Sequence, residues 1–149
     1  MNGGFSRERL EEKTSYLRER VDKLSKIAAG KNEAELAAFL AEEINFAGVK
    51  YMLQTAIQAV IDSAYHLCAK VYHRAPESAV DALIILRDQG ALTEGQFQAL
   101  VPMVKFRTRV VHGYEDVTAA AVTDILRGHL GDFAVWGEVL GRLLNVAEN

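Results

Sequence analysis

The most reactive side chains of this sequence lie close together in the stretch 105–116. His112 carries an imidazole, a group that gives or takes a proton near neutral pH, as general acid–base catalysis requires. Arg107 carries a guanidinium that would hold a phosphate by two parallel hydrogen bonds and stabilise negative charge in a transition state. These two groups would suffice for cleavage of RNA by its own ribose 2′-hydroxyl, and they call for no metal or other cofactor.

The spacing predicts how these groups are presented. Each helical residue turns the chain by roughly 100°, so Thr108 and His112 share a face, whereas Arg107 lies roughly 140° from His112. Gly113 is expected to end the helix, because glycine adopts the left-handed conformation without a Cβ clash. Tyr114 would then fold back towards His112. We predict an exposed polar cluster at a helix end.

A structural interpretation of the same residues stays open. A match to Arg-x4-His arises often by chance, and a histidine near a helix end is commonly a cap or a partner of the helix dipole. The rest of the sequence is needed to distinguish the catalytic interpretation from the structural one.

The composition is typical of one folded domain. The chain has 149 residues, of which 50% are hydrophobic and 25% charged, which predicts a single domain over 1–149 with residues 1–5 flexible. The net charge of −3 means that any attraction for a polyanion must be local. Cys68 is the single cysteine, so a reducing compartment and a buried, unreactive thiol are expected. No signal-like or membrane-spanning apolar run is present, which predicts a cytoplasmic protein.

Apolar residues recur at helical spacing throughout and no strand pattern appears, which predicts an all-α, up-and-down bundle of about five helices. The first has a heptad seam beginning at Leu10, which we interpret as packing within its own bundle. The predicted helices span 6–29, 32–73 with a break near 45–48, 77–89, 93–112 and 118–146.

Local signals mark the helix ends. Ser6 offers half a capping box, and Pro76 is expected in the first turn of a helix. Pro102 is expected to kink its helix or restart it. Other predicted caps and stops are Gly30, Asn32 with Glu35, Gly90, Thr93 with Gln96, and Thr118. The predicted last helix contains four glycines, which close approach of another helix would explain. They are Gly128, Gly131, Gly137 and Gly141.

Asp62 and His66 are four residues apart and share a helix face. A zinc site wants three or four such ligands and no second cluster accompanies them, so we interpret them as polar residues of a helix surface or interface.

The Arg107…His112-Gly113-Tyr114 pattern resembles the signature of HEPN-domain proteins, and more closely that of the HepT toxins of HEPN/MNT toxin–antitoxin pairs. The order of parts is similar to that family over residues 8–145. The segments 51–62 and 66–67 resemble its long second helix, and 76–90 with 92–103 resemble the stretch that leads into its motif.

The resemblance implies a HEPN-like bundle that forms a twofold homodimer, with two motifs facing one cleft. It implies a metal-independent endoribonuclease toxin in which Arg107 and His112 are catalytic. It also implies an MNT-type nucleotidyltransferase antitoxin that transfers AMP to Tyr114. The added bulk and negative charge would keep RNA out of the cleft.

Thr108 departs from the family pattern, since many members carry asparagine directly after the arginine. A threonine can make one hydrogen bond to His112 but lacks the two-ended geometry of an amide. Thr108 and Arg109 are expected to support the site, and Lys105 and Arg109 to bind RNA. Two copies of these cations, joined by Lys70 and Arg74, would make a basic groove on an acidic protein.

Two other functions are compatible with the sequence. The chain could be a catalytically silent HEPN module that binds a nucleotide or a protein in the same cleft. It could also be a helical scaffold, which burial of His112 and Tyr114 would favour.

Overall fold

The structure is a computed structural model that describes residues 7–148, with side chains as far as Asn145. That part of the chain is all-α, as predicted, but it has seven helices and not about five. They are α1 (Arg7–Ala29), α2 (Glu33–Ala41), α3 (Glu43–Lys70), α4 (Ala79–Asp88), α5 (Glu94–Val111), α6 (Ala119–Gly128) and α7 (Gly131–Glu148). The predictions for residues 1–5 and for Ser6 lie outside the described residues.

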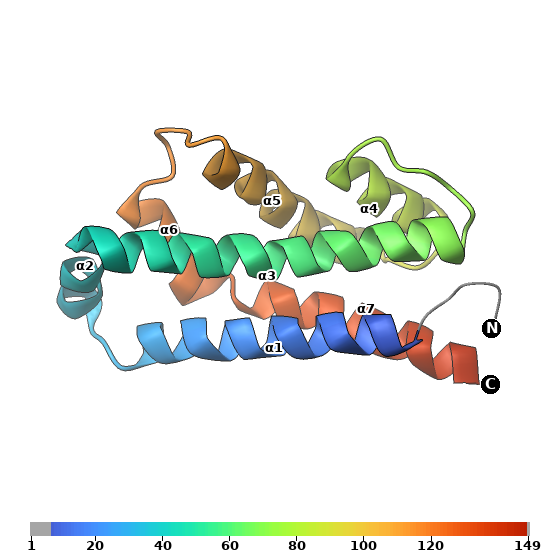
Figure 1. Ribbon diagram of the computed structural model, residues 1–149, viewed down its shortest axis with the longest axis horizontal. Helices are drawn as coiled ribbons and strands as arrows, with labels where there is room; N and C mark the ends of the chain where they lie inside the picture. The colour runs from blue at the N-terminus through green and yellow to red at the C-terminus, as the bar shows by residue number, and fades with distance from the viewer. Residues whose placement is uncertain (1–6, 149) are drawn as a thin grey trace.

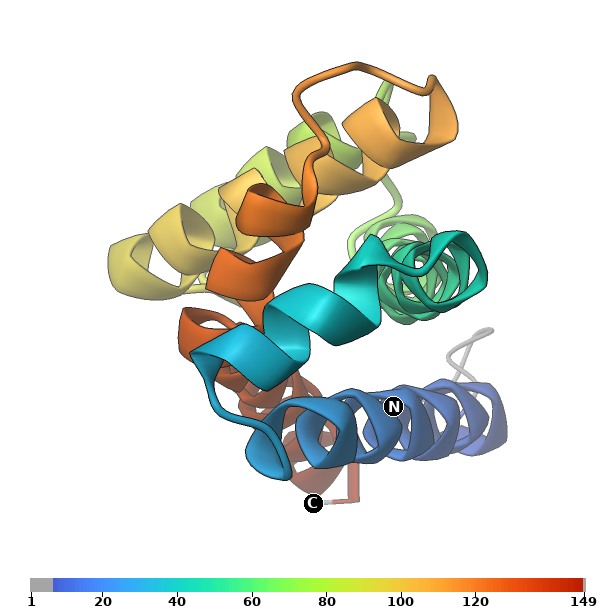
Figure 2. The same ribbon diagram turned by 90° about the vertical axis from the view of Figure 1, so that its left-hand side faces the viewer.

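The long helix α3 is the centre of the bundle. It packs against α1 on one side and against α4 and α5 on the other, and it runs antiparallel to α1 (Figure 1). Figure 2 shows α2 crossing the end of the bundle between α1 and α3. All seven helices contribute to one apolar core. In the described part of the chain, no helix has both the length and the apolar character needed to cross a membrane.

The predicted side-chain caps are confirmed. Asn32 accepts a hydrogen bond from Glu35 N at 2.8 Å, and the Glu35 carboxylate accepts one from Asn32 N at 2.9 Å. Thr93 and Gln96 form the same reciprocal box at the start of α5, at 3.1 and 2.9 Å. Thr118 caps α6. Each of these signals lies within four residues of sequence, which is why it could be read without the fold.

The predicted break near 45–48 is displaced to Glu42, which has extended dihedrals (φ −75°, ψ 122°) between α2 and α3. Gly48 lies inside α3. The Asn45 amide reaches back and donates to Phe39 O at 3.1 Å, and the same carbonyl accepts from Glu42 N–H at 3.3 Å. A side chain of the next helix therefore completes this boundary, and no glycine or proline marks it.

The predicted last helix is also divided. His129 leaves the helical conformation (φ −127°, ψ 2°) and separates α6 from α7. Close helix approach does not explain the glycines here, since a Cβ on Gly128, Gly131, Gly137 or Gly141 would meet no neighbouring atom within 4 Å. Glycine disfavours the helical conformation by about 1 kcal/mol relative to alanine. Ending one helix at Gly128 and beginning the next at Gly131 therefore costs little free energy.

Neither proline begins a helix. Helix α5 continues through Pro102 without a restart. Pro102 and Gln98 are both exposed, so water can solvate the Gln98 carbonyl that loses its helical donor. Pro76 precedes α4 and does not form its first turn. Ser78 caps that helix instead, by accepting from Asp81 N at 3.0 Å.

Cys68 is fully buried, as predicted, with its thiol 3.5 Å from Ala82 O. Burial raises the pKa of the Cys68 thiol to about 11, so the thiolate needed for reactivity is scarce.

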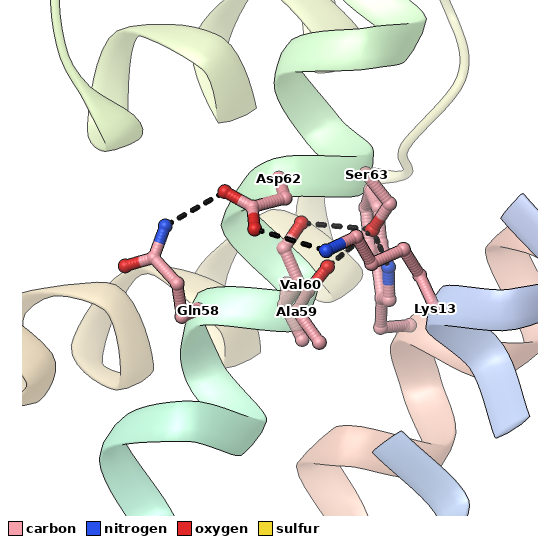
Figure 3. A network of polar contacts seen from close by, with 7 residues as sticks. Lys13, Gln58, Ala59, Val60, Asp62 and Ser63 are labelled. Carbon is pink, nitrogen blue, oxygen red and sulfur yellow. Dashed lines mark hydrogen bonds and ion pairs between the residues drawn. The ribbon is translucent and has the colours of Figure 1, made fainter. Parts of the chain in front are cut away.

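A buried hydrogen bond ties α3 to α7. Trp136 Nε1 donates to Ser63 Oγ at 2.8 Å, and the Ser63 hydroxyl donates to Ala59 O at 2.8 Å (Figure 3). Ser63 is 1% exposed and Trp136 is 0% exposed.

We expect Ser63→Ala to lower the free energy of unfolding by about 1–3 kcal/mol, because it leaves the indole N–H buried without an acceptor. Urea unfolding of the variant measures this loss. In a Trp136→Phe background the same substitution should cost much less. An equal cost in both backgrounds would show that the indole bond is not its source.

Candidate functional site

The predicted end of α5 at Gly113 is confirmed. Gly113 has φ +68°, and its N–H donates to Val110 O at 3.2 Å. Tyr114 N–H donates to Arg109 O at 3.0 Å. These two bonds make a Schellman motif, which pairs the last carbonyls of a helix and turns the chain sharply. The motif fixes the direction in which His112 and Tyr114 leave the helix.

His112 and Tyr114 lie together on the surface. Their rings stack with centroids 6.0 Å apart and planes inclined by 29°. His112 is exposed and Tyr114 is 54% exposed. The predicted folding back of the tyrosine is confirmed, and the exposure of both rings argues against a purely structural role.

Arg107 is half-buried, in contrast to the exposed cluster that we predicted. It continues the stripe of Phe97, Leu100 and Val104, all of which are buried. Its Nε is buried and has no hydrogen-bond partner among the described residues. Arg107 therefore extends from the core side of α5, whereas His112 is on its solvent side. The three- and four-residue spacing assigns Arg107 to this stripe, but its charge makes the position look exposed in the sequence.

The side chains of the predicted supporting residues differ in the contacts that they already make. The Thr108 hydroxyl donates to Val104 O at 3.5 Å, back along its own helix. Arg109 Nε lies 3.4 Å from Asp116 Oδ2, with both side chains partly exposed. An exposed pair of this kind contributes little stability, so Arg109 can exchange Asp116 for a phosphate at small cost. Lys105 is exposed.

Within a single chain, Lys70 and Arg74 do not lie beside the motif. Figure 1 places the end of α3 at one end of the bundle and the loop after α5 towards the other. A cavity of about 250 Å³ lies between α3, α5, α6 and α7, and its lining includes Arg109 but neither Arg107 nor His112. The motif is thus an open surface site within a single chain.

Among residues 7–148, no group of three or more His, Cys, Asp or Glu side chains is placed to hold a metal ion. The Asp62 carboxylate, considered above with His66, is bonded instead by Lys13 and Gln58.

Gly113→Ala is expected to destabilise the protein by about 1–2 kcal/mol, because alanine is strained at positive φ. It should also displace the His112–Tyr114 pair. Gly141→Ala is the matched control, since that glycine is helical and its Cβ would meet nothing within 4 Å. The control should stabilise by about 0.5–1 kcal/mol. Thermal unfolding of both proteins tests the opposite signs, and a shift of the same sign would contradict this account of the turn.

A protein-family comparison matches residues 10–136 to the model described as "Ribonuclease HepT-like". A curated relative, the mRNA nuclease HepT of Shewanella oneidensis, is 28% identical over 88 residues. That alignment covers 59% of this chain and 66% of the relative, slightly less than two thirds of its length.

Two solved structures are similar to the whole bundle. The tri-AMPylated HEPN toxin of Shewanella oneidensis, in complex with MNT antitoxin, superposes with a TM-score of 0.80 at 20% identity. That alignment covers 92% of this chain and 99% of the toxin. YutE of Bacillus subtilis, a cytosolic protein of unknown function, superposes with a TM-score of 0.79 at 14% identity, covering 98% of this chain and 95% of YutE. At these identities the similarity identifies a HEPN-like fold.

Proposed function

Because this chain belongs to the family of HepT-like ribonucleases, we propose that it is an RNA-cleaving toxin whose reaction uses Arg107 and His112 without a metal. The observation that carries the proposal is the solvent-exposed imidazole of His112 at the end of α5, stacked on the ring of Tyr114. A general acid or base must reach the proton that it transfers, and His112 meets this requirement.

The reaction would be an attack of the ribose 2′-oxygen on the adjacent phosphorus, with loss of the 5′-oxygen. His112 would take the proton from the 2′-hydroxyl or give one to the departing 5′-oxygen. The Arg107 guanidinium would bind the non-bridging oxygens and stabilise their charge. The buried Nε of Arg107 restricts the side chain, so the guanidinium is partly positioned before RNA binds.

We propose a twofold homodimer with the two motifs in one cleft. In a single chain Arg107 is half-buried on α5, whereas His112 is exposed just beyond the last residue of that helix, so the two groups do not share one helix face. A second copy would bring another pair of these groups to the same phosphate and would offer one imidazole as base and another as acid. It would also double the local positive charge of Lys105 and Arg109 on a chain of net charge −3.

Tyr114 is the proposed site of AMP transfer by an MNT-type antitoxin. Its ring is 54% exposed and stacks on His112, so an AMP on its hydroxyl would stand over the imidazole. Co-expression with a cognate nucleotidyltransferase should add the mass of AMP to the peptide that contains Tyr114. A peptide that stays unmodified while the toxin is neutralised would reject this site.

Growth after induction of the chain alone tests the function. We expect arrest with the wild-type protein, and relief of the arrest by Arg107→Ala or His112→Ala in proteins that remain folded. Persistent toxicity of both variants would rule out the catalytic assignment.

One observation favours a second candidate, a silent module that binds a nucleotide or a protein. The Thr108 hydroxyl is directed to Val104 O and does not assist His112. Intact RNA after incubation with purified protein, together with measurable binding of a nucleotide, would support this alternative.

A further inference from the structure

The cavity between α3, α5, α6 and α7 has mainly apolar walls and a few polar residues. Its volume is about 250 Å³, and its main apolar side chains are Leu53, Ile57, Met103, Phe106, Ile125 and Phe133. The polar residues of the lining are Arg109, Asp124, His129 and Asp132. An apolar cavity of about 150 Å³ is large enough to bind benzene, so this cavity has room for a single ring system. It suits a flat apolar group that carries polar atoms on its edge.

The polar lining favours a ligand with N–H donors over an anion. Arg109 Nε lies 3.4 Å from Asp116 Oδ2. His129 Nδ1 lies 3.3 Å from Asp132 Oδ2. Neither Arg109 nor His129 therefore leaves excess positive charge beside the cavity. Asp124 is exposed, and its carboxylate has no hydrogen bond or ion pair to another described residue. A carboxylate is an acceptor only, so the ligand has to supply the donor.

Arg109 connects the cavity to the motif. It lines the cavity, and its guanidinium carbon lies 5.8 Å from the centroid of the Phe106 ring. His112 follows three residues later, and its N–H still donates to Thr108 O at 3.0 Å, so helical spacing applies to it. Residues three apart on a helix are surface neighbours, with Cβ atoms about 5–6 Å apart. A ring in the cavity would therefore lie near the atoms on which His112 is proposed to act.

We propose that this cavity binds one nucleobase of the RNA substrate and selects a base with an exocyclic amino group. The ring would lie among the apolar walls, which include the aromatic side chains Phe106 and Phe133. The amino group would donate to the Asp124 carboxylate. The phosphate would stay outside the cavity, on the side of Arg109 that faces His112. The inference rests on the proposed RNA cleavage for the source of the base, but not for the binding of the base itself.

The carboxylate of Asp124 distinguishes this occupant from others. A base with a carbonyl in place of the amino group, such as uracil or hypoxanthine, would turn oxygen lone pairs towards the carboxylate and is disfavoured. A leucine or phenylalanine side chain of a partner protein would fill the apolar walls but would offer Asp124 no donor. An amino-bearing base satisfies both parts of the lining.

Nucleosides test the cavity without any cleavage. Adenosine and cytidine carry the amino group, and inosine and uridine are their counterparts with a carbonyl in its place. The readout is the NMR signal of the Met103 methyl group, assigned by its loss in Met103→Leu, and Met52, which does not line the cavity, is the internal reference. Adenosine or cytidine should shift the Met103 signal and bind about tenfold or more tightly than its counterpart. A shift by neither nucleoside, or equal affinities within both pairs, would overturn the proposal.

Two neighbouring alanines of α6 provide matched variants. Ala121 is half-buried and lines the cavity, whereas Ala120 is exposed and does not. Ala121→Phe should abolish nucleoside binding, because the new ring occupies the cavity, and Ala120→Phe should bind as the wild-type protein does. Asp124→Asn should remove the preference for the amino group, because an amide offers a donor as well as an acceptor. An unchanged preference in Asp124→Asn would contradict the assignment, even if Ala121→Phe fails to fold.

Short oligonucleotides decide whether the base belongs to RNA. Oligocytidylate, oligoadenylate and oligouridylate are added to the His112→Ala variant, so that they survive if the wild-type protein cleaves RNA. The oligomer of the preferred amino base should shift the Met103 signal, and oligouridylate should bind about tenfold more weakly or less. A shift by free nucleosides alone would overturn the assignment to the RNA substrate. Absence of RNA cleavage by the wild-type protein would reject the proposed function and would leave the nucleoside titrations as they are.

Discussion

His112→Ala is expected to lower the rate of RNA cleavage by about 10²- to 10⁴-fold, the usual contribution of a general acid or base. The substitution removes an exposed side chain after the last residue of α5, so the fold and the affinity for RNA should change little. Single-turnover cleavage of an RNA by the purified protein, with separate measurement of binding, distinguishes loss of chemistry from loss of affinity.

His129→Ala is the matched control for this experiment. His129 is also an exposed histidine at a helix C-cap, at the end of α6, and its Nδ1 lies 3.3 Å from Asp132 Oδ2. If it acts only as a helix cap, its loss should leave the cleavage rate within about twofold of the wild-type rate, since exposed caps affect stability by a few tenths of a kcal/mol to 1 kcal/mol. Equal losses in the two variants would mean that His112 acts through the helix end and not through proton transfer.

The sequence was sufficient wherever a structural feature is decided within one helical turn. The capping boxes at Asn32 and Thr93 and the left-handed turn at Gly113 need only neighbouring residues, and all three are confirmed. The stacking of His112 on Tyr114 follows from that turn, which is why this part of the candidate site could be predicted.

Tertiary contacts decided what could not be predicted. The break at Glu42 carries no glycine or proline signal, and the glycines beside His129 recur along the predicted last helix, so they did not mark the position of its break. Arg127 shows the kind of interaction involved, since its guanidinium donates to Ala28 O at 2.7 Å and to Lys31 O at 2.6 Å, nearly 100 residues earlier in the chain. These bonds join α6 to the end of α1, and no spacing rule reveals them.

Arg107 could be predicted only in part. Its position on α5 follows from the sequence, whereas its burial depends on the packing of the bundle. The proposed reaction requires a guanidinium at this position, whereas an apolar side chain like those of Leu100 and Val104 would stabilise the fold more. A buried nitrogen without a hydrogen-bond partner costs about 1–3 kcal/mol. The presence of Arg107 at the proposed site therefore lowers the free energy of unfolding.

Arg107→Met separates these two demands. Methionine has a similar length and no polar atom to satisfy, so we expect RNA cleavage to fall by about 10²-fold or more, as for loss of one donor to a transition-state oxyanion. The free energy of unfolding should rise by about 1 kcal/mol, since the unpaired Nε is removed. Arg109→Met is the control, because Arg109 is partly exposed and pairs with Asp116, so its loss should change stability by about 0.5 kcal/mol or less. Urea unfolding and cleavage assays on both variants test the pair of effects. If Arg107→Met destabilises the protein, the guanidinium supports the fold through contacts that outweigh its buried Nε, and a fall in cleavage could then no longer be assigned to chemistry.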